Sequence, residues 1–136
     1  MRSNYILAVE DDENDITLMK RIFQKQMPDY SIKYISDGEE ALEYLRSTKF
    51  REEPPRLILL DIKIPKVSGL ELLKSIRLMD EYKSIPVVML SSSDREDEIQ
   101  LSYHLGANSY IEKPKTFTDL CKTLPAMMDY WIVYNR

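Results

Sequence analysis

The chain has 136 residues, 43% of them hydrophobic, which is enough to bury one substantial core, so we expect a single domain. Charges of the two signs nearly balance, with a net charge of -4 and a pI near 5.1, and this excludes the basic surface that nucleic acid or an anionic membrane requires. Cys121 is the only cysteine, so no intrachain disulfide can form. With no signal peptide pattern and no run near the roughly 20 apolar residues of a membrane span, we expect a cytoplasmic protein.

Five runs of apolar or β-branched residues predict strands. The run over 57–60 has no polar alternation, which is typical of a strand buried on both faces in a parallel sheet. Pro65 has no N–H to donate to a sheet, so this strand must end before it and a loop must open. The predicted strands cover residues 5–9, 30–35 at an edge, 57–60, 85–90 and 110–111.

Stretches with apolar residues at helical spacing follow the strands and predict helices. Asp12, Asn14 or Asp15 can cap the first of them. Residues 50–55 are interpreted instead as a polar connection stiffened by two prolines. Five strands that alternate with five helices predict an α/β fold with a mainly parallel sheet.

Two later helices carry distinctive residues. Asp94 and Glu96 suit the first turn of the helix after the fourth strand, where negative charge meets the positive end of the helix dipole. The last helix is expected from about Thr118. Pro125 interrupts it, which predicts a kink or a late start because an interior proline removes a backbone hydrogen bond.

Polar side chains stand at the ends of four predicted strands. Glu10 and Asp11 end the first, Asp61 the third, Ser91 the fourth and Lys113 the fifth. Because the carboxyl ends of parallel strands share one edge of a sheet, we expect these side chains to meet. Three carboxylates at one point repel one another unless a cation lies among them, and oxygen ligands without His or Cys indicate Mg²⁺. A cation bound there would attract phosphate.

Dispersed motifs occur in the order and spacing typical of one family: Val9-Glu10-Asp11, Leu60-Asp61-Ile62-Lys63-Ile64-Pro65 with Gly69, Ser91, Gly106-Ala107 with Tyr110, and Lys113-Pro114. With them the chain resembles, over essentially its whole length, the receiver domain of bacterial response regulators. The resemblance implies a (βα)5 flavodoxin-like, doubly wound sheet of strand order 2-1-3-4-5, and a single receiver domain over residues 1–136 without an output domain. A weaker likeness is to the small receivers that partner bacteriophytochrome kinases.

The resemblance also implies roles. Asp61 would accept a phosphoryl group from a histidine kinase or a histidine phosphotransfer protein. Asp11 and Asp61 would hold Mg²⁺, together with Glu10 through water and the backbone carbonyl of Lys63. Lys113 would pair with a phosphoryl oxygen. The chain would therefore catalyse its own phosphorylation and dephosphorylation without being a turnover enzyme.

A switch is implied as well. Ser91 would donate a hydrogen bond to another phosphoryl oxygen and draw its loop inward, and Tyr110 would then rotate inward, changing a surface for protein–protein interaction. In this family the Lys113-Pro114 peptide is usually cis. Lys63 and Ser93 occupy positions that modulate the reaction. Lys63 cannot orient an attacking water, which predicts slow self-hydrolysis, and Ser93 is small and leaves the site open.

The C-terminal stretch 127–134 holds several large apolar groups, of which some must be exposed, and we expect a homodimer through the last helices. A flavodoxin-like electron carrier is disfavoured, because four acids after the first strand would repel a flavin phosphate. A haloacid-dehalogenase-type phosphatase wants an acid where Lys63 stands. One alternative stays open, a pseudo-receiver that is never phosphorylated and acts only as an interaction module.

Overall fold

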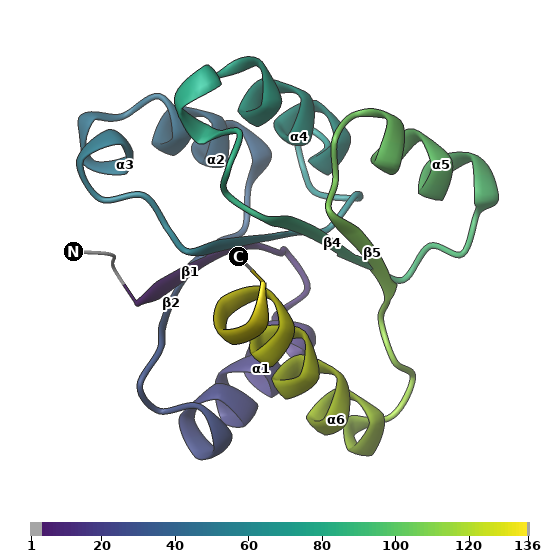
Figure 1. The fold of residues 1–136 in the computed structure, drawn as a ribbon. Coiled ribbons are helices and arrows are strands. Elements are labelled where there is room, and N and C mark those ends of the chain that lie inside the picture. Colours follow the sequence, from purple (N-terminus) through teal and green to yellow (C-terminus); the bar gives the residue numbers. More distant parts are fainter. Residues whose placement is uncertain (1–3, 136) are drawn as a thin grey trace.

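A computed structural model describes residues 4–135 and contains a five-stranded parallel sheet of order β2-β1-β3-β4-β5 (Figure 1). This confirms the predicted fold class and strand order. The strands are β1 (Tyr5–Val9), β2 (Ser31–Ile35), β3 (Leu57–Leu60), β4 (Val87–Ser91) and β5 (Ser109–Glu112). The helices are α1 (Glu13–Gln26), α2 (Gly38–Leu45), α3 (Thr48–Glu52), α4 (Gly69–Leu78), α5 (Glu96–His104) and α6 (Phe117–Met128), with a 3₁₀ turn η1 (Asp80–Tyr82) and a π-helical segment η2 (Asp129–Tyr134).

Helices cover both faces of the sheet, with α1 and α6 on one side and α2 to α5 on the other (Figure 1). The central strand β3 is buried along its whole length, and its side chains alternate between the two cores. Leu57 and Leu59 pack on the α1 and α6 side, while Ile58 and Leu60 pack under α2 and α4. A strand this apolar fixes the level at which Asp61 leaves the sheet. None of the described helices is long and apolar enough to cross a membrane.

The expected polar connection over 50–55 was wrong for its first residues, because residues 48–52 form the short helix α3. Ser47 caps it by accepting a hydrogen bond from the Phe50 N–H. Phe50 is fully buried, and its ring makes edge contacts with Tyr44 and Tyr82 at centroid distances of 5.6 and 4.7 Å. A single apolar residue in a one-turn helix gives no periodicity to detect, so only the packing shows it.

One predicted helix start needs correction, while the start of the last helix at about Thr118 is confirmed by α6, which begins at Phe117. Asp94 lies before α5 rather than in its first turn, because Arg95 still has extended backbone and the helix begins at Glu96. The last helix does not start late at Pro125: Thr116 caps it by accepting from the Asp119 N–H, so α6 begins well before the proline and continues through it. The side-chain cap at the N-terminus of the helix stabilises it more than the loss of one backbone hydrogen bond at Pro125, near the C-terminal end, destabilises it.

Candidate functional site

One ammonium group and three carboxylates meet at the carboxyl edge of the sheet. Lys113 follows β5, and its Nζ lies 2.6 Å from Glu10 Oε2, 2.9 Å from Asp61 Oδ2 and 2.8 Å from Asp15 Oδ2. The side chains of Glu10 and Asp61 are 4% and 8% exposed. The structure therefore brings together residues from the ends of β1, β3 and β5, as the sequence predicts.

Backbone groups fix the carboxylates in place. Asp61 Oδ1 accepts a 2.7 Å hydrogen bond from the Ile62 N–H, and Glu10 Oε1 accepts one of 3.0 Å from the Asp12 N–H. Gly69 packs directly against the loop that follows β3, since a Cβ at this position would lie 1.8 Å from the Asp61 carbonyl oxygen. Only glycine permits this approach, which holds α4 against the start of the loop.

The burial of this cluster shifts its proton equilibria. Burial raises the pKa of Glu10 to about 7, although the Lys113 ammonium and the Asp12 N–H lower it and the Asp61 charge raises it further. Burial by itself lowers the pKa of Lys113, but the hydrogen bonds that its ammonium donates to Asp15, Glu10 and Asp61 outweigh it, so the pKa lies above the ordinary value. Lys113 is therefore charged at neutral pH, and its positive charge offsets part of the negative charge of the three carboxylates that contact it.

A divalent cation fits the donors present. Glu10, Asp11 and Asp61 each offer a carboxylate oxygen, and these atoms lie within 4.8 Å of one another. Asp11 is exposed and has no ion pair with Lys113. Oxygen donors alone suit a hard cation. The site thus combines two buried carboxylates, Glu10 and Asp61, which pair with Lys113, and one exposed carboxylate, Asp11, which is available to bind a cation.

Asp11, Asp61 and Lys113 line a cleft of about 660 Å³, whereas Glu10 lies beneath it and is not part of its lining. Lys63 is exposed and contributes to the same cleft, two residues beyond Asp61.

Sequence reasoning treated Asp15 only as a possible cap and missed its contact with Lys113. The cap is Asp12, which accepts from the Asp15 N–H. The missed signal was spacing: Asp15 lies one helical turn after Asp11, and so on the turn of α1 next to the strand ends.

The switch residues lie beside the cleft. Ser91 is buried, does not line the cleft, and accepts a 3.3 Å hydrogen bond from the Ser93 N–H through its hydroxyl oxygen. The Ser93 hydroxyl bonds the carboxylate of Glu98 on α5, and the Tyr110 hydroxyl donates a 2.7 Å bond to the Ser93 carbonyl oxygen. Tyr110 is thereby tied to the loop after β4. The Lys113-Pro114 peptide is trans, which differs from what the family resemblance implies.

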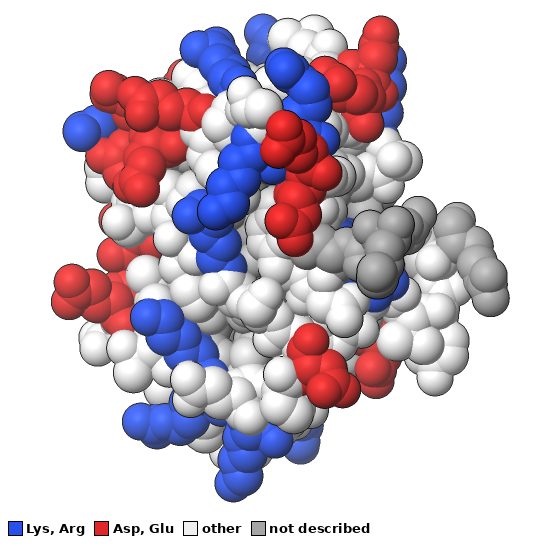
Figure 2. All heavy atoms as spheres, turned by 90° about the vertical axis from the view of Figure 1, so that its left-hand side faces the viewer, with Lys and Arg blue, Asp and Glu red and all other residues white. Residues whose placement is uncertain are grey.

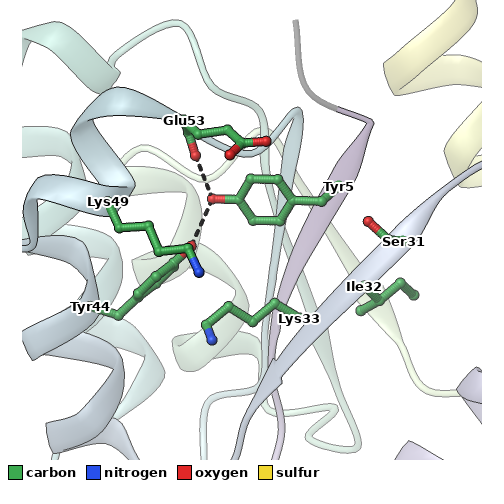
Figure 3. A pocket seen from close by; sticks show the side chains of 7 residues that line it. All are labelled: Tyr5, Ser31, Ile32, Lys33, Tyr44, Lys49 and Glu53. Carbon is green, nitrogen blue, oxygen red and sulfur yellow. Dashed lines mark hydrogen bonds between the residues drawn. The ribbon is translucent and has the colours of Figure 1, made fainter.

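A second hollow, of about 410 Å³, lies at the amino-terminal ends of β1 and β2 (Figure 3). The Tyr5 hydroxyl donates to the Glu53 carbonyl oxygen at 2.7 Å and shares a 2.9 Å hydrogen bond with the Tyr44 hydroxyl. None of the predicted site residues lines it. On this side of the molecule basic and acidic groups are interspersed, with no surface of a single sign (Figure 2).

The arrangement defines a class: a doubly wound α/β domain with an acidic cluster and a lysine at the carboxyl edge of its sheet. A family model, the response regulator receiver domain, matches residues 6–125. The chain belongs to this family, and it is a receiver of two-component signalling.

Relatives agree with this assignment. The probable methanogenesis regulatory protein FilR2 of Methanothrix harundinacea is 37% identical over 132 residues, covering 96% of this chain and 85% of that protein. The structure of the phosphorylated cyanobacterial phytochrome response regulator RcpA has 34% identity and a TM-score of 0.90, covering 98% of this chain and 97% of that one. The Mn²⁺-bound form of Rcp1, a response regulator of Synechocystis sp., has 32% identity and a TM-score of 0.86 over the same shares. The predicted likeness to phytochrome-linked receivers is confirmed.

Proposed function

We propose that Asp61 takes a phosphoryl group from the histidine of a sensor kinase or of a histidine phosphotransfer protein. The observation that carries the proposal is the 2.9 Å contact between Asp61 Oδ2 and Lys113 Nζ, in a cleft that both residues line. The relative RcpA, whose structure is that of a phosphorylated response regulator, supports it. One cytoplasmic receiver unit over residues 1–136, without nucleic-acid or membrane partners, stays a prediction.

The proposed reaction is a direct displacement. A carboxylate oxygen of Asp61 attacks phosphorus as the phosphorus–nitrogen bond of the donor histidine breaks, and the nitrogen keeps the electron pair and takes up a proton. The product is an acyl phosphate on Asp61. Lys113 pairs with one phosphoryl oxygen as a point charge, and the Ser91 hydroxyl donates to another.

The proposed cofactor is Mg²⁺. Asp11 and Asp61 would hold it directly, Glu10 through water, and Lys63 through its backbone carbonyl. Bound there, the cation would supply positive charge that offsets the negative charge of the phosphoryl oxygens and of Asp61. The Mn²⁺-bound structure of Rcp1 supports a divalent ion in this family.

The proposed output is a changed surface around Ser91 and Tyr110. When the Ser91 hydroxyl turns toward a phosphoryl oxygen, its loop moves, and this loop carries the Ser93 carbonyl that holds the Tyr110 hydroxyl at 2.7 Å. Tyr110 is partly buried and packs against the core under α2 and α4. A shift of the loop therefore reaches a surface that a partner protein can bind.

Mass spectrometry tests the reaction. The chain is incubated with phosphoramidate and Mg²⁺, and we expect a gain of one phosphoryl group that is absent in Asp61→Ala. Glu53→Gln, an acid at the opposite edge of the sheet, serves as the control and should react like the wild type. A wild type that gains no mass under these conditions would favour the pseudo-receiver.

Lys63 gives a second test of the same site. We propose that its cation slows hydrolysis of the acyl phosphate, since it lines the cleft but cannot orient a water as an amide does. Lys63→Asn should lose the phosphoryl group faster than the wild type. An unchanged or slower loss contradicts the proposed effect, and Ser93→Ala shows separately whether that small residue matters.

We propose, finally, a homodimer through the C-terminal helices. Tyr130, Val133 and Tyr134 are 53%, 57% and 71% exposed and lie within about one turn of η2, and exposed side chains of this kind often mark an interface. Light scattering across a concentration series should show a dimer. The triple replacement of these residues by serine should give a monomer, while a wild type that is monomeric at every concentration contradicts the proposal.

A further inference from the structure

Lys113 has three N–H donors and three carboxylate partners, and the partners differ in what the reaction asks of them. Glu10 and Asp61 also belong to the acidic group that could hold a metal. Asp15 does not: its oxygen contacts Lys113 at 2.8 Å but is outside that group. Asp15 is thus the one partner of Lys113 that would keep its contact with the ammonium when a cation binds to Glu10 and Asp61 or a phosphoryl group is attached to Asp61.

We infer that Asp15 is a positioning residue, which holds the Lys113 ammonium beside Asp61 throughout the reaction. The inference rests on the proposed function and names a residue that directs it. Asp15 stands in the first turn of α1, and its side chain is 33% exposed at the rim of the cleft. One acceptor on α1 therefore fixes a lysine that comes from the far end of the chain.

The geometry explains why the lysine needs an anchor. Lys113 Nζ lies closest to Glu10, at 2.6 Å, which is the most buried of its three partners. Without Asp15 the ammonium would be drawn toward Glu10 and Asp61 alone. When the phosphoryl group joins Asp61, the lysine must stay within reach of its oxygens, and a partner on α1 that lies outside the acidic group keeps it there.

A merely structural role for Asp15 is separable. Its carboxylate is not the helix cap, because Asp12 performs that task and Asp15 only donates its backbone N–H to it. What remains is the general benefit of an acid in the first turn of a helix. Glu13 shares this benefit, is exposed, and lines the same cleft without an ion pair to Lys113, so it provides a matched control.

The test compares Asp15→Asn with Glu13→Gln. Phosphorylation by phosphoramidate is followed at saturating Mg²⁺ and donor, and Mg²⁺ affinity is measured separately by calorimetry. We expect Asp15→Asn to lower the saturated rate about tenfold with Mg²⁺ affinity within twofold of wild type, and Glu13→Gln to leave both within twofold. In a Lys113→Met background Asp15→Asn should have no further effect.

Two outcomes overturn the inference. One is an Asp15→Asn rate equal to or above that of Glu13→Gln, and the other is an equal loss with and without Lys113. A wild type that takes up no phosphoryl group overturns the proposed function, and the positioning role with it. A wild type that reacts beside an unimpaired Asp15→Asn overturns the positioning role alone.

Discussion

The two ends of the sheet show hollows built on opposite terms. At the carboxyl edge, three carboxylates share the single ammonium of Lys113. At the amino edge, the Tyr5 hydroxyl shares a hydrogen bond with the Tyr44 hydroxyl and donates another to the Glu53 carbonyl oxygen, and burial raises the pKa of Tyr5. The first set is incomplete without a cation or a transferred group, whereas the second satisfies itself. The excess negative charge at the carboxyl edge marks that hollow as a site for chemistry, whereas the neutral, hydrogen-bonded hydroxyls at the amino edge mark the other as packing.

The largest expected effect comes from removing the ammonium. Lys113→Met leaves the buried carboxylates unpaired and should lower the free energy of unfolding by about 3 kcal/mol at neutral pH in metal-free buffer. Lys33→Met at the amino edge, where Nζ lies 4.9 Å from the Tyr44 ring centroid, should cost only about 0.5 kcal/mol. Urea unfolding measures both, and equal losses would erase the difference between the two ends.

Mg²⁺ should act at one end only. At a hundred times its dissociation constant it should raise the free energy of unfolding by about 2.7 kcal/mol, because a ligand that binds only the folded state stabilises that state. Asp11→Asn should lose most of this gain, since Asp11 is the exposed acid of the group. Thermal unfolding with and without Mg²⁺ tests it, with Glu53→Gln as the unaffected control, and a full response in Asp11→Asn would contradict the site.

A smaller effect follows from Glu10. Its pKa rises from 4.5 to about 7 on folding, so the folded state holds this proton more tightly. Its contribution to stability is therefore present below about pH 4.5 and is lost as the pH rises through about 7. In metal-free buffer, the free energy of unfolding measured with urea should fall as the pH rises from 5 to 8, and it should fall less in Glu10→Gln. A wild type with the same slope as this variant would contradict the shift.

Sequence reasoning reached the strands and the strand ends because both follow from local patterns. Residues 57–60 are apolar throughout, and Asp61 follows them directly. It missed the contact of Asp15 with Lys113 because Asp15 lies inside α1 rather than at a strand end, so the contact depends on how the first turn of α1 is placed beside the end of β5. Helix α3 escaped for a related reason: Phe50 is buried by aromatic partners that no window around it contains.

At the amino edge, the loss of one hydroxyl should have a smaller effect than the changes at the carboxyl edge. Tyr5→Phe removes a hydroxyl bonded at 2.7 Å to the Glu53 carbonyl and at 2.9 Å to Tyr44, and should lower the free energy of unfolding by about 1 kcal/mol. Phosphoryl uptake on Asp61 should stay within twofold of wild type, because the hollow lies at the other end of β1. Urea unfolding and mass spectrometry of the same sample give both values. If Tyr5→Phe lowers phosphoryl uptake by more than twofold in protein that is still folded, the two ends of the sheet are coupled. The sheet would then transmit strain to the carboxylates rather than support them rigidly.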